Sequence, residues 1–338
     1  MKKTLLALAV LATTAGSVNA AEIVKTDDAT VNFYGQLREY LIKGSEDSDA
    51  AFTNSSSRIG VDLAYKTSDT LKVVGAVELF ANDSKGGENR RHWIGVSSSD
   101  YGTLTIGKQA ILSDDIWGVE NDILGNGFSV LPEADGYDMK AIQQSILKYS
   151  IEGDAGWFKA AYSYDNGDQN PTTAEVYVGT SVSDFDIYGG VGYQDDRTNT
   201  STTKLTVNGS NVESTTTSAK ADKELTHGMF TVNYNGDGWH LGTTYWHAEV
   251  EDNNADSKLT SDSFALAGDY SITEKVSLYA AYEYILDFQE EGNDLNSIMG
   301  GVAYKYASWL KVYAEAGTWD QDSADSDYYW GTGARLYW

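Results

Sequence analysis

The stretch Trp330–Trp338, WGTGARLYW, decides the fold. Every second residue, from position 330 to position 338, is apolar or neutral, whereas Arg335, Tyr337 and two glycines occupy the alternate positions. A period of two is that of a β-strand whose two faces meet different surroundings. Trp338 is the last residue of the sequence, so we expect an aromatic strand end that no later segment covers.

The other end of the chain predicts export. Lys2 and Lys3 precede an apolar stretch from Leu5 to about Leu11, and small residues precede a cleavage site after Ala20. This pattern is typical of a secretory signal peptide, here residues 1–20, and is too short for a membrane-spanning helix. An exported chain that ends in a bare amphipathic strand favours an outer-membrane β-barrel, which we expect to be a single domain over residues 21–338.

Composition narrows the choice. The net charge of −26 opposes nucleic-acid binding, and the absence of cysteine excludes a disulfide scaffold and a thiolate metal site. The chain has 23 Tyr, 9 Trp and 33 Gly but only two Pro. This profile suits a transmembrane barrel, in which only alternate residues meet lipid and aromatic rings favour the membrane interfaces. On composition alone, a soluble all-β sandwich remains an alternative.

Segments of period two recur along the whole chain. We expect about 16 strands, of which Val276–Leu286 is a clear example: Leu278 and Ala280 share one face, and Tyr279 and Ala281 share the other. Tight connections alternate with long acidic ones, as in antiparallel up-and-down barrels of outer membranes. The Ser/Thr/Asn-rich residues 198–217 are predicted to form a mobile surface loop.

One long connection stands out. Residues 111–140 carry seven acidic side chains and a single lysine, together with apolar residues that an exposed loop does not need. Long loops without regular structure are usually functional or disordered, and apolar content argues against disorder. We therefore expect a packed third extracellular loop folded into the barrel. The alternative is an ordinary solvated acidic loop.

Basic residues are few, so their positions are informative. Arg38, Arg58 and Arg90 fall near the loop-proximal ends of the first, second and fourth predicted strands, and Arg38 should face inward by its parity. Together they would form a positive patch on one inner wall. Opposite an acidic inserted loop, such a patch sets up a transverse field that discriminates between solutes by charge. The alternative is that these arginines neutralise loop carboxylates at the rim.

No catalytic or metal site is predicted. The four histidines lack metal-ligand spacing, and neither a G-x-S-x-G motif nor a phosphate-binding glycine loop occurs. The sequence therefore predicts neither an enzyme nor a cofactor.

Several stretches resemble the general, trimeric porins of Gram-negative bacteria, most of all those of marine gammaproteobacteria. They are Ala21–Ile23, Val31–Gly35, Ser57–Gly60, Arg90–Gly95, Tyr101–Gly107, Leu131–Glu133 and the aromatic-terminated last strand.

The resemblance implies a barrel of 16 strands, a homotrimer joined along the first strands, and a third loop that constricts the pore. By that likeness Glu133 and, more weakly, Asp135 are acidic constriction residues. Arg58 and Arg90 are basic wall residues, and Arg38 substitutes for a lysine that many members carry at position 36. Trp338 is the barrel assembly signal.

The resulting hypothesis is a pore for passive diffusion of small hydrophilic solutes and ions, with a preference for cations. The other expected partners are outer-membrane lipid, lipopolysaccharide and the barrel assembly machinery. A second hypothesis is an oligosaccharide-specific porin that uses Trp93, Trp117 and Trp319 as stacking platforms. A third is a non-transporting surface adhesin.

Overall fold

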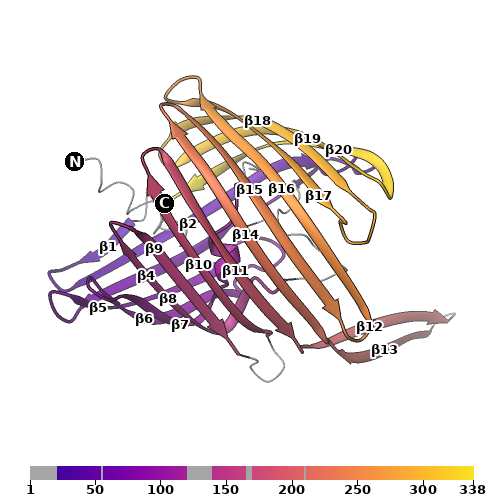
Figure 1. Cartoon of the computed structure of the whole chain (residues 1–338), viewed down its shortest axis with the longest axis horizontal. Helices are drawn as coiled ribbons and strands as arrows, with labels where there is room; N and C mark the ends of the chain where they lie inside the picture. Colours follow the sequence, from indigo (N-terminus) through magenta and orange to yellow (C-terminus); the bar gives the residue numbers. More distant parts are fainter. Residues whose placement is uncertain (1–20, 55, 120–138, 165–169, 209–210) are drawn as a thin grey trace.

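The computed structural model describes residues 21–54, 56–119, 139–164, 170–208 and 211–338, and the side chains of all of these except residues 200–219. They form an antiparallel β-barrel with strongly tilted strands (Figure 1). The long strands of the barrel wall are β2 (Ala29–Lys43), β4 (Arg58–Lys66), β5 (Leu71–Phe80), β6 (Asn89–Ser98), β7 (Gly102–Ala110), β8 (Ile142–Gly153), β9 (Gly156–Ser163), β10 (Thr172–Val182), β11 (Phe185–Asp196), β14 (Lys223–Gly236), β15 (Trp239–Asp252), β16 (Ser257–Ser271), β17 (Val276–Leu286), β18 (Leu295–Ala307), β19 (Leu310–Gln321) and β20 (Ala324–Tyr337).

The barrel closes where the first long strand meets the last. β2 pairs with β20 along one edge and with β4 along the other. Within the described residues the sheet has 18 strands, but β1 (Ala21–Lys25) and β3 (Ala51–Thr53) are short. Both pair with β2. β1 lies along the edge of β2 that also pairs with β20, and β3 lies along the edge that also pairs with β4. The other 16 strands form the closed wall, as predicted, so every wall strand is hydrogen-bonded on both sides.

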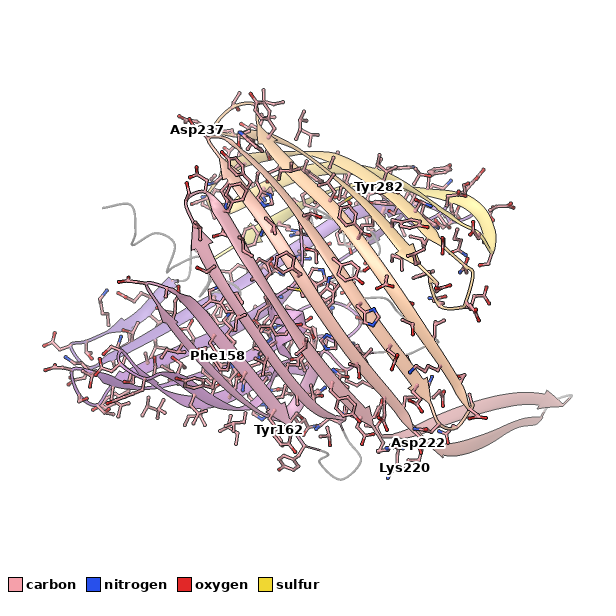
Figure 2. The ribbon with its side chains drawn as sticks, in the orientation of Figure 1. Phe158, Tyr162, Lys220, Asp222, Asp237 and Tyr282 are labelled. Atoms are coloured by element: carbon pink, nitrogen blue, oxygen red, sulfur yellow. The ribbon has the colours of Figure 1, made fainter. Side chains whose placement is uncertain are left out.

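The two faces of each strand differ as the alternation predicted. In β17 the Leu278 side chain is 46% exposed, whereas Tyr279, the next residue, is 6% exposed. Phe158, Tyr162 and Tyr282, labelled in Figure 2, also belong to the outer face and are at least one-third exposed. A continuous outer face of exposed leucine, valine and aromatic side chains suits a hydrocarbon environment. In the described part of the chain, no helix combines the length and hydropathy needed to cross a bilayer.

Tyrosine rings lie over glycines on the inner wall. A Cβ added at Gly301 would lie 2.3 Å from the ring of Tyr279, and one added at Gly60 would lie 2.4 Å from the ring of Tyr34. A larger residue at either position would therefore displace the ring that covers the strand. These ring contacts account for part of the unusual tyrosine and glycine content.

A clear departure from the sequence prediction lies between β11 and β14. Residues predicted to form a mobile loop instead form a hairpin of β12 (Asn199–Asn208) and β13 (Asn211–Lys220), which extends beyond the barrel wall (Figure 1). Repeated threonines favour extended backbone, and the dipeptide Asn208-Gly209 is a strong signal for a tight hairpin turn. A Ser/Thr-rich composition had suggested irregular structure, but the β-branched threonines decide the conformation.

Candidate pore constriction

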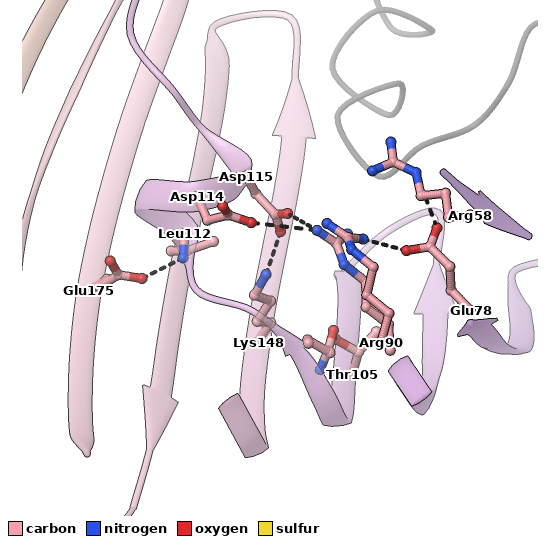
Figure 3. A network of polar contacts seen from close by, with 11 residues as sticks. Arg58, Glu78, Arg90, Thr105, Leu112, Asp114, Asp115, Lys148 and Glu175 are labelled. Carbon is pink, nitrogen blue, oxygen red and sulfur yellow. Dashed lines mark hydrogen bonds and ion pairs between the residues drawn. The ribbon is translucent and has the colours of Figure 1, made fainter. Parts of the chain in front are cut away.

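The chain turns into the barrel at the end of β7. Ile111 and Leu112 are fully or almost fully buried, and a single helical turn, α2 (Leu112–Asp115), follows. The backbone N–H groups of Leu112 and Ser113 both donate to the carboxylate of Glu175, on the inner face of β10. The Ser113 hydroxyl donates to the same carboxylate at 2.6 Å. Glu175 therefore fixes the start of this inner segment, residues 111–119 (Figure 3).

The inner segment then follows the wall as far as β15. The Tyr188 hydroxyl of β11 donates to the carbonyl oxygen of Trp117 at 3.1 Å. The backbone N–H of Val119 donates to the Thr244 hydroxyl of β15 at 2.7 Å, and the rings of Trp117 and Trp246 lie 6.0 Å apart. Contacts with β10, β11 and β15 place residues 111–119 inside the barrel. The predicted extent of the constriction loop, residues 111–140, stays a prediction because residues 120–138 lie outside the described part of the chain.

The acidic side chains of α2 face a basic wall. Arg91 of β6 places one guanidinium nitrogen 3.4 Å from Asp115 and 3.6 Å from Asp114. Lys148 of β8 forms an ion pair with Asp115 on its other side (Figure 3). Because Asp115 has two basic partners and Asp114 has one longer contact, Asp114 retains more of its negative field toward the lumen. Burial raises the pKa of the Asp114 carboxyl, and the charge of Asp115 raises it further.

A second charged cluster surrounds Glu78 of β5, whose side chain is buried. Its carboxylate pairs with Arg90 of β6 and lies 3.6 Å from the guanidinium of Arg58 on β4. The structure thus brings two of the three predicted wall arginines together around one acid that the sequence reading did not single out. Arg38 lies on the same inner wall, opposite Arg335 of β20 and close enough to Arg58 for the two charges to repel.

A β-bulge directs two adjacent arginines to the lumen. Glu78 pairs with Arg91 and Leu79 pairs with Asn89, so Arg90 is an extra residue without a partner across β5. A bulge of this kind interrupts the strict alternation of the strand. Arg90 and Arg91 therefore both form ion pairs inside the barrel, one with the wall and one with α2. Period-two reasoning allows only one inward residue of the two, which is why Arg91 was missed.

The remaining predicted site residues stand as follows. Glu133 and Asp135 lie outside the described residues. Trp338 exchanges backbone hydrogen bonds with Gly35 of β2, and its ring lies 5.8 Å from that of Phe33. These contacts join the two ends of the barrel wall, whereas the role of Trp338 as an assembly signal stays a prediction. Among the described residues, no group of three or more histidine or acidic side chains could hold a metal ion.

Known proteins share this sequence pattern and geometry. A family model described as Gram-negative porin matches residues 7–325. Porin-like protein H of Photobacterium profundum is 28% identical over 341 residues, which cover 97% of this chain and 98% of that protein. A loop L8 deletion mutant of OmpT, an outer membrane protein of Vibrio cholerae, has a TM-score of 0.80 and 34% identity, covering 92% of this chain and 100% of its own. The trimer form of in-vitro folded OmpT has a TM-score of 0.78 and 32% identity, with the same coverage.

A closed barrel of 16 strands with a charged segment inside it defines an outer-membrane channel. The chain belongs to the Gram-negative porin family. Family and fold together make it an outer-membrane channel for passive diffusion, and they point away from an enzyme.

Proposed function

We propose that the chain forms a homotrimeric, water-filled pore for small hydrophilic solutes and ions, with a preference for cations. The observation that carries this proposal is the inner segment, which crosses from β7 to β15 inside the barrel and presents Asp114 and Asp115 to basic side chains of the wall. A segment held inside a closed barrel narrows the water path, and its charges then act on every solute that passes.

The arrangement of charge supports a transverse field at this level. Acidic groups come from α2, and basic groups come from β4, β6 and β8. Opposed charges that line a narrow constriction are screened far less than those on the exposed loops, which lose their influence beyond about 8–10 Å at physiological salt. Polar solutes with a dipole are oriented by such a field, whereas apolar solutes gain no electrostatic stabilisation from it.

Cation preference rests on the acidic members of the constriction. The net charge is −26, and seven acidic residues lie between positions 111 and 140. We propose that Glu133, with Asp135 as a weaker contributor, supplies the part of the field that attracts cations, opposite Arg38, Arg58 and Arg90. Asp114, which is partly exposed, contributes from the described part of the same segment.

The trimer proposal rests on the outer face of the first strands. Leu37, Val61, Leu63 and Val77 on β2, β4 and β5 are all exposed in the single chain. A threefold arrangement would bury this face against neighbouring copies, and the trimer form of the similar OmpT structure supports that assembly. The rest of the outer face would meet lipid and lipopolysaccharide, and the barrel assembly machinery would insert the chain with Trp338 as its signal.

The oligosaccharide hypothesis has less support. Trp117 packs against Trp246, and the ring of Trp319 lies 6.2 Å from that of Tyr329. Rings packed in this way lose one face that a sugar would need. The adhesin hypothesis predicts a barrel without current, so the same recording tests it.

A planar-bilayer recording of refolded protein in a salt gradient tests the proposal. We expect current steps in groups of three. We also expect a reversal potential whose sign indicates a preference for cations. Glu133→Gln should shift that potential toward anions. Glu152→Gln, a matched change at an exposed carboxylate at the short-turn end of β8, should leave it unchanged. An absence of steps would contradict the channel, and a shift with Glu152→Gln alone would contradict the assignment of the filter.

A further inference from the structure

Four basic residues form a row across neighbouring strands of the inner wall. In the strand register, Lys305 of β18 lies opposite Lys311 of β19. Lys311 lies opposite Arg335 of β20, and Arg335 lies opposite Arg38 of β2. The next residues in register, Tyr304 and Val312, are exposed on the outer face, which places the row on the inner face. We call these four residues the basic row.

The row concentrates charge of one sign. Side chains directly opposite each other on antiparallel strands have Cβ atoms about 4.5–5.5 Å apart, so the four residues follow one another over roughly 15 Å. Like charges in that arrangement are destabilising. Within the described residues, Lys305, Lys311 and Arg38 form no ion pair, and the Nε of Arg38 is buried without a hydrogen-bond partner. The guanidinium of Arg335 lies over the ring of Tyr313 at 5.6 Å.

One carboxylate on the same wall lies beside the row. Glu315 is the inward acidic residue of β19, four positions after Lys311. It accepts hydrogen bonds from the Tyr279 and Tyr329 hydroxyls at 2.9 and 3.0 Å. Glu315 is a single acid beside four basic residues. The wall keeps a net positive stripe although the chain as a whole carries −26.

The position of the row connects it to the constriction. At one end, Arg38 is two residues from Gln36, which lies opposite Arg58 on the neighbouring strand β4. Arg58 in turn forms an ion pair with Glu78. At the other end, the backbone N–H of Lys305 donates to Lys275 in the short turn before β17. The stripe therefore leads from the level of Arg58 to the mouth of the barrel on the short-turn side.

We propose that the basic row binds solutes that carry two or more phosphate groups and guides them between the constriction and the short-turn mouth. Guanidinium and ammonium groups are the preferred partners of phosphate oxygens. A row of several cations about 5 Å apart acts on a multivalent anion at several points at once, whereas it acts on chloride at one point only. This inference rests on the proposed channel function and adds a class of solute to it.

Block of the ionic current by tripolyphosphate tests the inference. We expect tripolyphosphate on the short-turn side to reduce the single-channel potassium chloride current of the wild-type trimer in a saturable way. The double variant Lys305→Gln/Lys311→Gln should raise the half-blocking concentration roughly fourfold for each charge removed, the factor for a unit charge at about 5 Å in water. The conservative variant Lys305→Arg/Lys311→Arg should keep the wild-type value.

Lys258→Gln is the control, because Lys258 is exposed and paired with Glu249 on the long-loop side. It should leave the half-blocking concentration unchanged. Single-channel steps of normal size in each variant show that the barrel has folded. Lys305→Gln alone, at the exposed rim, provides a milder second variant. Equal block in wild type and in the glutamine variants, or no block of the wild type, would overturn the inference while the channel stands. An absence of current altogether would instead overturn the channel.

Discussion

The backbone N–H of Val119 donates to the hydroxyl of Thr244 at 2.7 Å, although 125 positions separate the two residues. This bond attaches the far end of the described inner segment to the wall opposite its origin, while Glu175 holds the near end. Together the two attachments turn a loop, which would otherwise sample many conformations, into a fixed part of the pore lining. The width of the pore then depends on wall residues distant from the loop in sequence.

Removing the Thr244 attachment should make the open channel noisier. Thr244→Val keeps the shape of the side chain but leaves the Val119 N–H without its acceptor, at a cost of about 1–3 kcal/mol if the group stays buried. We expect more frequent current fluctuations in single-channel records. Thr243→Val is the matched control, because Thr243 lies on the other face and donates to the Ala265 carbonyl. Equal noise in both variants would show that the attachment does not restrain the segment.

Neutralising Arg91 should increase cation preference. Arg91→Gln removes the basic partner that Asp114 and Asp115 share, so Asp115 keeps only Lys148 and the constriction becomes more negative. Reversal potentials in a salt gradient measure the change. Lys72→Gln, at the short-turn end of β5, should have little effect because exposed charges are screened. A shift toward anions in Arg91→Gln would contradict the predicted role of this pair.

Cation preference should fall on mild acidification, earlier than exposed carboxylates alone would cause. The pKa of Asp114 is raised by burial and by the charge of Asp115, so this acid takes up a proton at a higher pH than a solvated aspartate does. Its negative charge is present above that raised pKa and is lost as the pH falls through it. In Asp114→Asn the early part of the pH dependence should disappear from the reversal potential. An unchanged pH profile in the variant would assign the effect to other acids.

The outer face should reject charge. Leu278→Arg places a cation in the hydrocarbon and should lower the free energy of unfolding by about 2–4 kcal/mol if the site is near the midplane of the membrane. Leu278→Phe keeps an apolar side chain and should be tolerated. Urea unfolding in lipid vesicles measures both. Equal stability of the two variants would mean that Leu278 does not face lipid.

Local alternation predicted most of the wall because each strand carries its own pattern. β17 has the bounds expected from the sequence alone, Val276–Leu286, and its two faces are assigned correctly. Those features depend on residues two positions apart in the chain. The closed barrel follows from them because an unpaired strand edge has no partner inside a membrane.

The constriction was only partly predictable, because its geometry depends on partners distant in sequence. The inward position of Arg91 requires a bulge that is defined only by the pairing of β6 with β5. Glu175 is 63 positions from Leu112, and nothing in its neighbourhood marks it as the anchor of the inner segment. The hairpin of β12 and β13 was missed for another reason, since serine and asparagine masked the strand preference of the threonines.

The central claim is that residues 111–119 rest against the β15 wall while the channel conducts, and a single disulfide tests it most directly. The chain has no cysteine, and a Cβ added at Gly118 would lie 3.0 Å from the Cβ of Thr244, so an outward shift of about 1 Å brings the pair to the spacing of about 3.5–4.5 Å in a disulfide. Gly118→Cys/Thr244→Cys should therefore oxidise to a bridge, measured by loss of free thiol. We expect the oxidised trimer to conduct with the same step size as the reduced one. Two thiols that stay free under oxidation, or a bridge that closes the pore, would contradict the claim.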